Sequence, residues 1–391
     1  RKQTEDWWKA QTAPAVTADL EGAAARFVDA RAHFEKLMRI HGASTMIAQA
    51  AYDQVKSLSE AAGLAGLERR LVTGYGDFEE SRIAAELWAV SRGRLSMEEF
   101  VGRHGYHGPR EGAVDSRSWR QDHTPLVGLV EKYRGMPDSD DPSDGWRARQ
   151  AERIAAEKEL LSALGPAARL KAKAILGFAR RHVPLREVSK AAFLHAIDAG
   201  RAAAWSHGQW LARNGHIDDP TEVFFLDLDD VASRRTDGLR EVISQRRDER
   251  DAFTKVYLPE KWTGNPTPIP LSSRQDGDGE ISGIAVSSGV VEGRVRVVLD
   301  LEQDDDIQAG EILVCETTDP SWASWFVLAS ALVIDIGGVM SHGAIVAREM
   351  GVPCVINTRD GTRRLSTGDL VRVDGDAAMV TILERAGSVA N

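Results

Sequence analysis

The 391-residue sequence is poor in cysteine, has no excess of basic charge and lacks a long hydrophobic run. Only Cys315 and Cys354 occur, both in apolar segments, so we expect buried thiols rather than a disulfide, and their spacing suits no metal. A net charge of −10 does not provide the basic footprint of a nucleic-acid-binding protein. No apolar segment is long enough to span a bilayer, and no secretory signal is present. We therefore expect a cytoplasmic protein that binds neither nucleic acid nor membrane, and we assign it no metal ligands.

The sequence also lacks internal repeats, low-complexity blocks and a glycine-rich loop of the kind that holds nucleotide phosphates. Its length is sufficient for two or three hydrophobic cores. The chain begins with Arg1 rather than with an initiating methionine, so we interpret it as a processed or trimmed product.

The sequence pattern changes from helical to β-rich at a proline-containing segment. Before it, the chain is rich in Ala, Leu, Glu and Arg, and apolar residues recur every three or four positions, as at Phe27, Ala30 and Phe34. This periodicity predicts long amphipathic helices. After it, short β-rich runs follow one another. We predict a multidomain α and α/β protein with a helical domain over 1–265, a linker over 266–278 and a compact α/β domain over 279–391.

Several helix ends in the first domain carry recognisable signals. Ser96 is followed three residues later by Glu99, which predicts a capped helix start. Pro184 is predicted to end one helix and to begin the next, over residues 185–214. Gly215 is predicted to cap the end of that second helix.

The most informative segment runs from Gly337 to Pro353. Apolar runs flank it on both sides, and the glycine pair Gly337–Gly338 precedes Ser341 and His342, which predicts strand, tight turn, helix and strand. As the predicted N-cap, Ser341 leaves His342 among backbone N–H groups that have no intrahelical partner. Such a helix start attracts phosphate, and a histidine there can act as a nucleophile that holds a phosphoryl group.

This segment resembles the phosphohistidine swivel domain of the phosphoenolpyruvate-utilising enzymes, which include pyruvate phosphate dikinase, phosphoenolpyruvate synthase and rifampicin phosphotransferase. The chain matches the family's Gly-Gly, Ser-His, Ala-Arg-Glu and Gly-Val-Pro elements in order, and departs from it at Ile334 and Met340, where threonine is common or regulated. Further similar blocks lie at residues 283–295, 310–320 and 368–375.

The resemblance implies a compact β/β/α swivel domain in which His342 accepts a phosphoryl group. It also implies that the loop around this histidine includes Gly337, Gly338, Ser341 and Arg348. Dikinase-style regulation at a threonine is not expected, because Met340 occupies that position.

A second set of polar residues lies in the helical domain. Arg186 and Lys190 are four residues apart on one predicted helix face, where like charges repel slightly and an anion between them would be stabilising. Residues 104–111, 184–190 and 215–226 resemble blocks of the central helical domain of rifampicin phosphotransferase and its relatives.

In that family the helical domain binds the hydroxyl acceptor. The resemblance implies that Arg186 and Lys190 are catalytic and hold the phosphoryl group in transit, and that His107, Arg110 and Glu187 border the acceptor. His107 or Glu187 is then a candidate for the base that takes the hydroxyl proton. Tyr106 and His107 replace the histidine and arginine usual in the family's loop, so the loop does not identify the acceptor.

Taken together, the resemblance implies a subunit or fragment of an ATP-dependent, dikinase-type phosphotransferase. An ATP-grasp subunit or domain outside this chain would bind ATP and Mg²⁺ and transfer a phosphoryl group, the β-phosphate in family style, to His342. The acceptor is expected to be a small hydroxyl-bearing aromatic compound, a phenol or an alkylphenol, because phenylphosphate and alkylphenyl phosphate synthases are split in this way.

Three other hypotheses remain open. A rifamycin-type antibiotic phosphotransferase would differ only in its acceptor. A fragment similar to phosphoenolpyruvate synthase would use pyruvate, although no pyruvate-binding barrel is recognisable. A non-enzymatic regulatory phosphocarrier would have no apolar acceptor pocket, and its phospho-His342 would be stable to small hydroxyl compounds.

Overall fold

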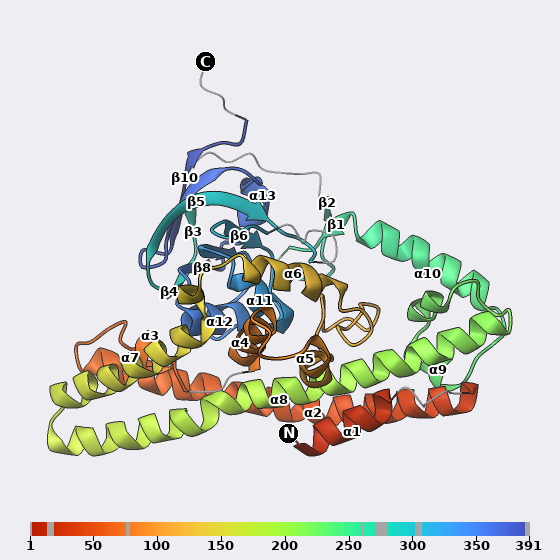
Figure 1. Ribbon diagram of the computed structural model, residues 1–391, viewed down its shortest axis with the longest axis horizontal. Coiled ribbons are helices and arrows are strands. Elements are labelled where there is room, and N and C mark those ends of the chain that lie inside the picture. Colours follow the sequence, from red (N-terminus) through yellow and green to blue (C-terminus); the bar gives the residue numbers. More distant parts are fainter. Residues whose placement is uncertain are drawn as a thin grey trace. The chain divides into compact units, whose positions relative to one another are not determined.

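The computed structural model describes residues 2–13, 19–75, 79–259, 261–270, 280–301 and 307–387 (Figure 1). Backbone contacts divide the chain into two compact units. The first unit comprises residues 1–36, 113–115 and 192–277, and the second comprises 37–112, 116–191 and 278–391. The predicted linker, 266–278, lies outside the described residues from position 271 onward.

The first unit is built from helices. It contains α1 (Lys2–Thr12), the start of α2 (Leu20–Ala61), the end of α8 (Pro166–Arg213), η2 (Pro220–Phe225), α9 (Leu228–Ala232), α10 (Leu239–Phe253) and the strand pair β1 (Val256–Tyr257) and β2 (Ile269–Pro270). Apolar side chains such as Phe27, Leu211 and Leu239 form its core. Gly215 follows α8 with φ +77°, which confirms the predicted glycine cap.

The predicted helix break at Pro184 is wrong. Helix α8 runs without interruption for 48 residues, and Pro184 lies inside it. A proline in a helix interior costs about 3 kcal/mol, because it removes a hydrogen bond and crowds the preceding turn. The flanking turns offset that cost by packing, since Val183 and Glu187 are both buried. Arg186 and Lys190 therefore lie in mid-helix, away from the positive end of a helix dipole.

The helices of the second unit include the rest of α2 and α8 together with shorter ones. These are α3 (Glu68–Leu71), α4 (Glu79–Ser91), α5 (Met97–His104), α6 (Thr124–Arg134), η1 (Asp138–Asp140) and α7 (Pro142–Ala163). The predicted cap of α5 is confirmed: Ser96 Oγ accepts from the Glu99 amide at 3.1 Å, and Glu99 Oε2 accepts from the Ser96 amide at 3.0 Å.

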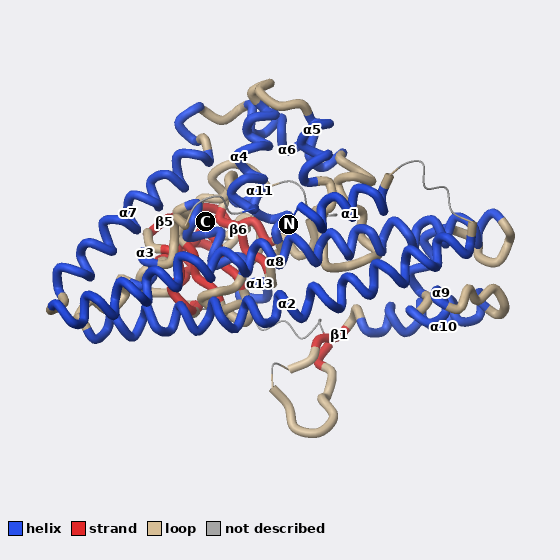
Figure 2. The backbone as a smooth tube through the Cα atoms, turned by 90° about the horizontal axis from the view of Figure 1, so that it is seen from below, coloured by secondary structure: helices blue, strands red, loops and turns tan. Residues whose placement is uncertain are grey.

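The second unit also contains an eight-stranded mixed sheet in the C-terminal region, drawn as a red group in Figure 2. Its strands, in the order 3-10-9-5-6-7-8-4, are β3 (Ile281–Ser282), β4 (Ile284–Ser287), β5 (Val290–Val297), β6 (Ile312–Cys315), β7 (Ala331–Ile334), β8 (Cys354–Ile356), β9 (Leu370–Asp374) and β10 (Met379–Glu384). Strands β5 to β8 are parallel, and β9 and β10 form an antiparallel hairpin.

Short helices follow the parallel strands β6, β7 and β8. They are η3 (Pro320–Trp322) with α11 (Ala323–Phe326), then α12 (His342–Met350) and α13 (Gly361–Arg364). The predicted strand–turn–helix–strand segment around His342 is confirmed as β7, α12 and β8. The expected fold class is likewise confirmed: a large helical region precedes a mixed α/β domain.

The sheet and the helices of the second unit share one hydrophobic core. Phe100 of α5 and Leu87 of α4 belong to the same buried cluster as Leu313 and Phe326. Both cysteines are buried and free, as predicted. Among the described residues, no helix combines the length and the apolar character that crossing a membrane requires.

Candidate active site

Two loops at one edge of the mixed sheet carry the polar side chains of the candidate site. Because β6, β7 and β8 are parallel, the loops that follow them leave from one edge, where ligands bind in open α/β sheets. The loop after β6 carries Thr318 and Asp319, and the loop after β7 leads to His342. The amide of Ile336 donates to the carbonyl of Glu316 at 2.8 Å, which ties the two loops together.

Close packing explains two of the glycines near His342. A Cβ at Gly337 would lie 2.4 Å from Ile356 Cδ1, and one at Gly343 would lie 2.6 Å from Ile334 Cδ1 and 2.8 Å from Thr318 Oγ1. A Cβ at Gly338 would meet nothing within 4 Å. Gly337 and Gly343 therefore let the start of α12 approach the sheet edge and Thr318.

Ser341 is the N-cap residue of α12, with φ −69° and ψ 164°, but its side chain makes no capping hydrogen bond. The backbone of Ser341 therefore has the conformation of an N-cap residue, but its hydroxyl does not accept the expected hydrogen bond. Its own amide donates to the Gly338 carbonyl at 2.9 Å, so a backbone turn rather than the side chain sets the start of the helix. The first N–H groups of α12 thus keep no side-chain acceptor at the N-cap.

His342 is the first residue of α12 and is 6% exposed. Its Nδ1 lies 3.3 Å from Thr318 Oγ1, a contact that orients the ring. Burial first, and then the charges of Lys190 and Arg186, hold the pKa of His342 well below its usual range. The imidazole is therefore neutral near pH 7, the state in which histidine is a nucleophile.

Three of the predicted residues, Arg186, Glu187 and Lys190, lie on two successive turns of α8. Arg186 forms an ion pair with Glu187, which is buried, and Lys190 follows one turn later. The structure thus brings Arg186 and Lys190 together with His342, since both charges act on its pKa. One neighbour was missed: His41 of α2, whose Nδ1 lies 3.1 Å from Ser189 Oγ, and no motif in the sequence marks it.

Arg348 of α12 is 5% exposed. Among the described residues its Nε and one terminal nitrogen have no hydrogen-bond acceptor, although both are buried. Burial lowers the pKa of Arg348, and the charge of Arg186 lowers it further. A buried guanidinium with unused donors near a second arginine is suited to an incoming anion.

His107 lies in the loop after α5, and its Nδ1 is 2.6 Å from Glu111 Oε2. Burial lowers the pKa of His107 to about 3, so its imidazole is neutral. The Glu111 amide donates to Asp319 Oδ2 at 3.3 Å, and burial together with Glu111 raises the pKa of Asp319 to about 7. The predicted acceptor residue Arg110 lies in the same loop with a left-handed φ of 48°.

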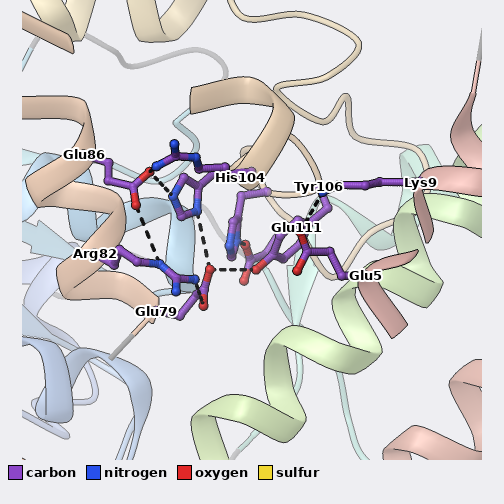
Figure 3. Close-up of polar contacts among 10 residues, drawn as sticks. Glu5, Lys9, Glu79, Arg82, Glu86, His104, Tyr106 and Glu111 are labelled. Carbon is purple, nitrogen blue, oxygen red and sulfur yellow. Dashed lines mark hydrogen bonds and ion pairs between the residues drawn. The ribbon is translucent and has the colours of Figure 1, made fainter. Parts of the chain in front are cut away.

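A further group that the sequence analysis missed adjoins His107. Glu79 at the start of α4 accepts from Tyr106 Oη at 3.1 Å and from Arg82 at 2.5 Å. Figure 3 shows the His104 ring between the carboxylates of Glu79 and Glu86. Ligand atoms of Glu79, His104 and His107 lie within 4.8 Å of one another, and no spacing rule connects Glu79 with this loop.

Two protein families match segments of the chain. Residues 307–378 match "PEP-utilising enzyme, mobile domain", and residues 93–187 match "Rifampicin phosphotransferase fourth domain". The first segment contains His342 and Arg348, and the second contains His107 and Arg186.

Individual relatives agree with these families. The rifampicin phosphotransferase of Streptomyces sviceus is 34% identical over 74% of this chain and 34% of its own length. That of Bacillus subtilis is 29% identical over 75% of this chain and 35% of its length. An uncharacterised protein of Mycobacterium tuberculosis is 33% identical over 72% of this chain and 30% of its length. The chain therefore spans about a third of the length of the curated relatives that it matches.

Proposed function

Because the chain carries the mobile domain of the PEP-utilising enzymes and the fourth domain of the rifampicin phosphotransferases, we propose that it forms part of a phosphotransferase. In this proposal His342 carries a phosphoryl group and delivers it to an organic hydroxyl. The observation that carries the proposal is a neutral, buried His342 beside the positive charges of Arg186 and Lys190. Residues 279–391 would be the mobile carrier, and the helical residues before the linker would hold the acceptor.

The transfer step follows from this arrangement. Thr318 holds Nδ1 of His342, and we assign the phosphoryl group to Nε2. The acceptor oxygen attacks phosphorus, the P–Nε2 bond breaks, and its electron pair returns to the imidazole. Arg186, Lys190 and Arg348 offset the charge on the phosphoryl oxygens. The hydroxyl proton passes to a base, for which Glu187 and His107 are the candidates.

ATP and Mg²⁺ belong to the proposal, but not to the site described above. The charges that act on His342 are the cations of Lys190 and Arg186, which repel a metal ion, whereas Mg²⁺ requires oxygen ligands. These residues therefore do not fit the metal. We propose that an ATP-grasp domain or subunit outside this chain holds both and phosphorylates His342 there.

Two acceptor classes are consistent with this chemistry. A phenol or alkylphenol is our first candidate, because its hydroxyl ionises readily and the ATP-binding part is sought outside this chain. A rifamycin fits at least as well, because the relatives from Streptomyces sviceus and Bacillus subtilis are named rifampicin phosphotransferases. Pyruvate as acceptor and a purely regulatory carrier are the remaining alternatives.

The decisive experiment separates loading from discharge. The purified chain is phosphorylated with phosphoramidate, and acid-labile phosphate on His342 is located by mass spectrometry. Phenol, an alkylphenol, a rifamycin and pyruvate are then added separately, and the phosphorylated product is identified. Discharge by one hydroxyl class would identify the acceptor, and discharge by pyruvate would favour the synthase-like alternative.

Two controls accompany this experiment. The His342→Ala variant should not be loaded, whereas His182→Ala, which alters a partly exposed histidine on α8, should behave as wild type. Acid-labile phosphate on His342→Ala would refute His342 as the carrier. Loading of wild type without discharge by any compound would refute transfer by this chain alone and favour a regulatory carrier.

A further inference from the structure

The cluster of Glu79, His104 and His107 is a separate feature of the second unit. These side chains are 6%, 0% and 1% exposed, respectively. Each offers one nitrogen or oxygen ligand atom, and the three atoms lie within 4.8 Å of one another. From this geometry we propose that Glu79, His104 and His107 bind one divalent transition-metal ion, with Zn²⁺ as the probe of choice. The proposal does not depend on the phosphotransferase function.

In each of the two histidine rings, one nitrogen contacts an outer carboxylate, and the other nitrogen remains as a possible metal ligand. His107 Nδ1 is paired with Glu111 Oε2 at 2.6 Å, and His104 Nε2 with Glu86 Oε2 at 3.2 Å. Among the described residues, the other nitrogens, His107 Nε2 and His104 Nδ1, are buried and have no hydrogen-bond partner. If each ring donates to its outer carboxylate, both inner nitrogens carry lone pairs.

A proton or a metal ion between these atoms would satisfy such lone pairs. His104 Nδ1 lies only 3.4 Å from Glu79 Oε1, so a bare lone pair would face a carboxylate there. A metal ion at the centre would accept electron pairs from both nitrogens and from Glu79. Two histidines and one carboxylate form a ligand set typical of catalytic zinc and of non-haem iron.

Outer contacts of this kind are characteristic of metal sites. Ligating histidines usually donate their second nitrogen to a carboxylate, which fixes the tautomer and the ring orientation. Here Glu111 and Glu86 occupy that role for the two histidines, while Tyr106 and Arg82 hold Glu79 (Figure 3). Every proposed ligand therefore already has an orienting partner.

The backbone holds the two histidines at a fixed separation. The His107 amide donates to the His104 carbonyl at 3.0 Å, and the Trp119 amide donates to the His107 carbonyl at 2.7 Å. A Cβ at Gly105 would lie 2.4 Å from the Val101 carbonyl oxygen, so the turn between them is closely packed. Ligand atoms around tetrahedral zinc lie about 3.4 Å apart, so small side-chain shifts are sufficient to close the site.

The charges nearby are compatible with a cation. Glu79, Glu86 and Glu111 contribute three carboxylates, whereas Arg82 and Arg103 contribute two positive charges. A proton on His104 is the competing solution, because it would bridge Glu79 and Glu86 without any metal. A metal on His107 Nε2 would also exclude that nitrogen as the transfer base and leave Glu187 in that role.

The test uses the full chain after metal removal with a chelator. Titration calorimetry with ZnCl₂ should show one tight site, and Co²⁺ should give the visible ligand-field bands of a site with nitrogen ligands. Glu79→Gln and His107→Gln should each weaken Zn²⁺ binding at least 100-fold. Glu86→Gln should weaken it about 10- to 100-fold, as outer-contact changes do. His123→Gln, which alters an exposed histidine, is the matched control and should have no effect.

Wild-type protein keeps the proposal falsifiable even if a variant fails to fold. Bound Zn²⁺ should raise the melting temperature, because a ligand that binds only the native state stabilises it. No saturable site, no ligand-field bands and no thermal shift in wild type would overturn the proposal and favour a protonated His104. Equal Zn²⁺ affinity in folded Glu79→Gln and wild type would overturn it as well.

Discussion

At the scale of single residues, burial determines the protonation state of His342. A solvent-exposed histidine is partly protonated near pH 7 and then has no lone pair to attack phosphorus. Burial of His342, together with the neighbouring cations, keeps it neutral. The cations that depress its pKa are also those that would stabilise a phosphoryl group, so one arrangement serves both the free and the phosphorylated histidine.

The first prediction concerns these cations. Lys190→Gln and Arg186→Gln should each slow discharge of phospho-His342 to its acceptor about 100-fold or more, because each removes a charge that offsets the transition state. Loading with phosphoramidate should persist, and both steps can be followed by acid-labile phosphate on the protein. Lys173→Gln, an exposed change on the same helix, provides the control. An unchanged discharge rate in both site variants would exclude a role for Arg186 and Lys190 in stabilising the transferred phosphoryl group.

At the scale of elements, close backbone approaches determine where glycine is required. In α8, a Cβ at Gly208 would lie 2.1 Å from the Pro220 carbonyl oxygen, whereas a Cβ at Gly177 would meet nothing within 4 Å. The two positions lie in the same helix and differ only in what surrounds them.

The second prediction follows from this difference. Gly208→Ala should lower the free energy of unfolding by about 2 kcal/mol or more, because backbone must move away from the new methyl group. Gly177→Ala should raise it by up to about 1 kcal/mol, since alanine favours the helix more than glycine does. Urea denaturation of the two variants and wild type measures both effects. Equal stability of the two variants would contradict the close approach.

Sequence patterns predicted elements better than they predicted contacts. The segment from β7 to β8 and the α5 capping box could be predicted, because hydrophobic runs and capping residues act over a few positions. The break at Pro184 was wrong, because packing around Val183 and Glu187 outweighs a local preference. Glu79 and His41 could not be found, since only tertiary packing brings Glu79 to His104 and His107 and brings His41 to Ser189.

At the scale of the whole molecule, two buried carboxyl groups couple stability to pH. Burial raises the pKa of Asp319 and of Glu349 to about 7, from ordinary values of 3.8 and 4.5. The Glu349 carboxyl accepts from the Gly74 amide at 2.8 Å. Between about pH 4 and pH 7 these two groups therefore bind more protons in the native state than in the unfolded state, and their contribution to stability decreases as the pH rises. The buried neutral histidines His107 and His342 act in the opposite direction below about pH 6.5, because they gain protons on unfolding.

The third prediction makes this dependence measurable. From pH 5 to pH 8 each of the two carboxyl groups should lower the free energy of unfolding by about 1 kcal/mol or more, since one pKa unit corresponds to about 1.4 kcal/mol. Asp319→Asn combined with Glu349→Gln should remove this contribution and make the pH slope of stability more positive than in wild type, as judged by urea denaturation at each pH. The exposed change Glu98→Gln should leave it unaltered. A slope retained in the double variant would assign the effect to other groups.

The burial of His342 also affects how much ATP the proposed reaction would consume for each product molecule. Phosphohistidine is prone to hydrolysis, and each phosphoryl group lost to solvent would consume ATP without making product. His342 is only 6% exposed, so it is shielded from bulk water in the arrangement in which Lys190 and Arg186 act on it. A phosphoryl group delivered there would meet an acceptor hydroxyl more often than a water molecule, so ATP consumption would stay coupled to product formation.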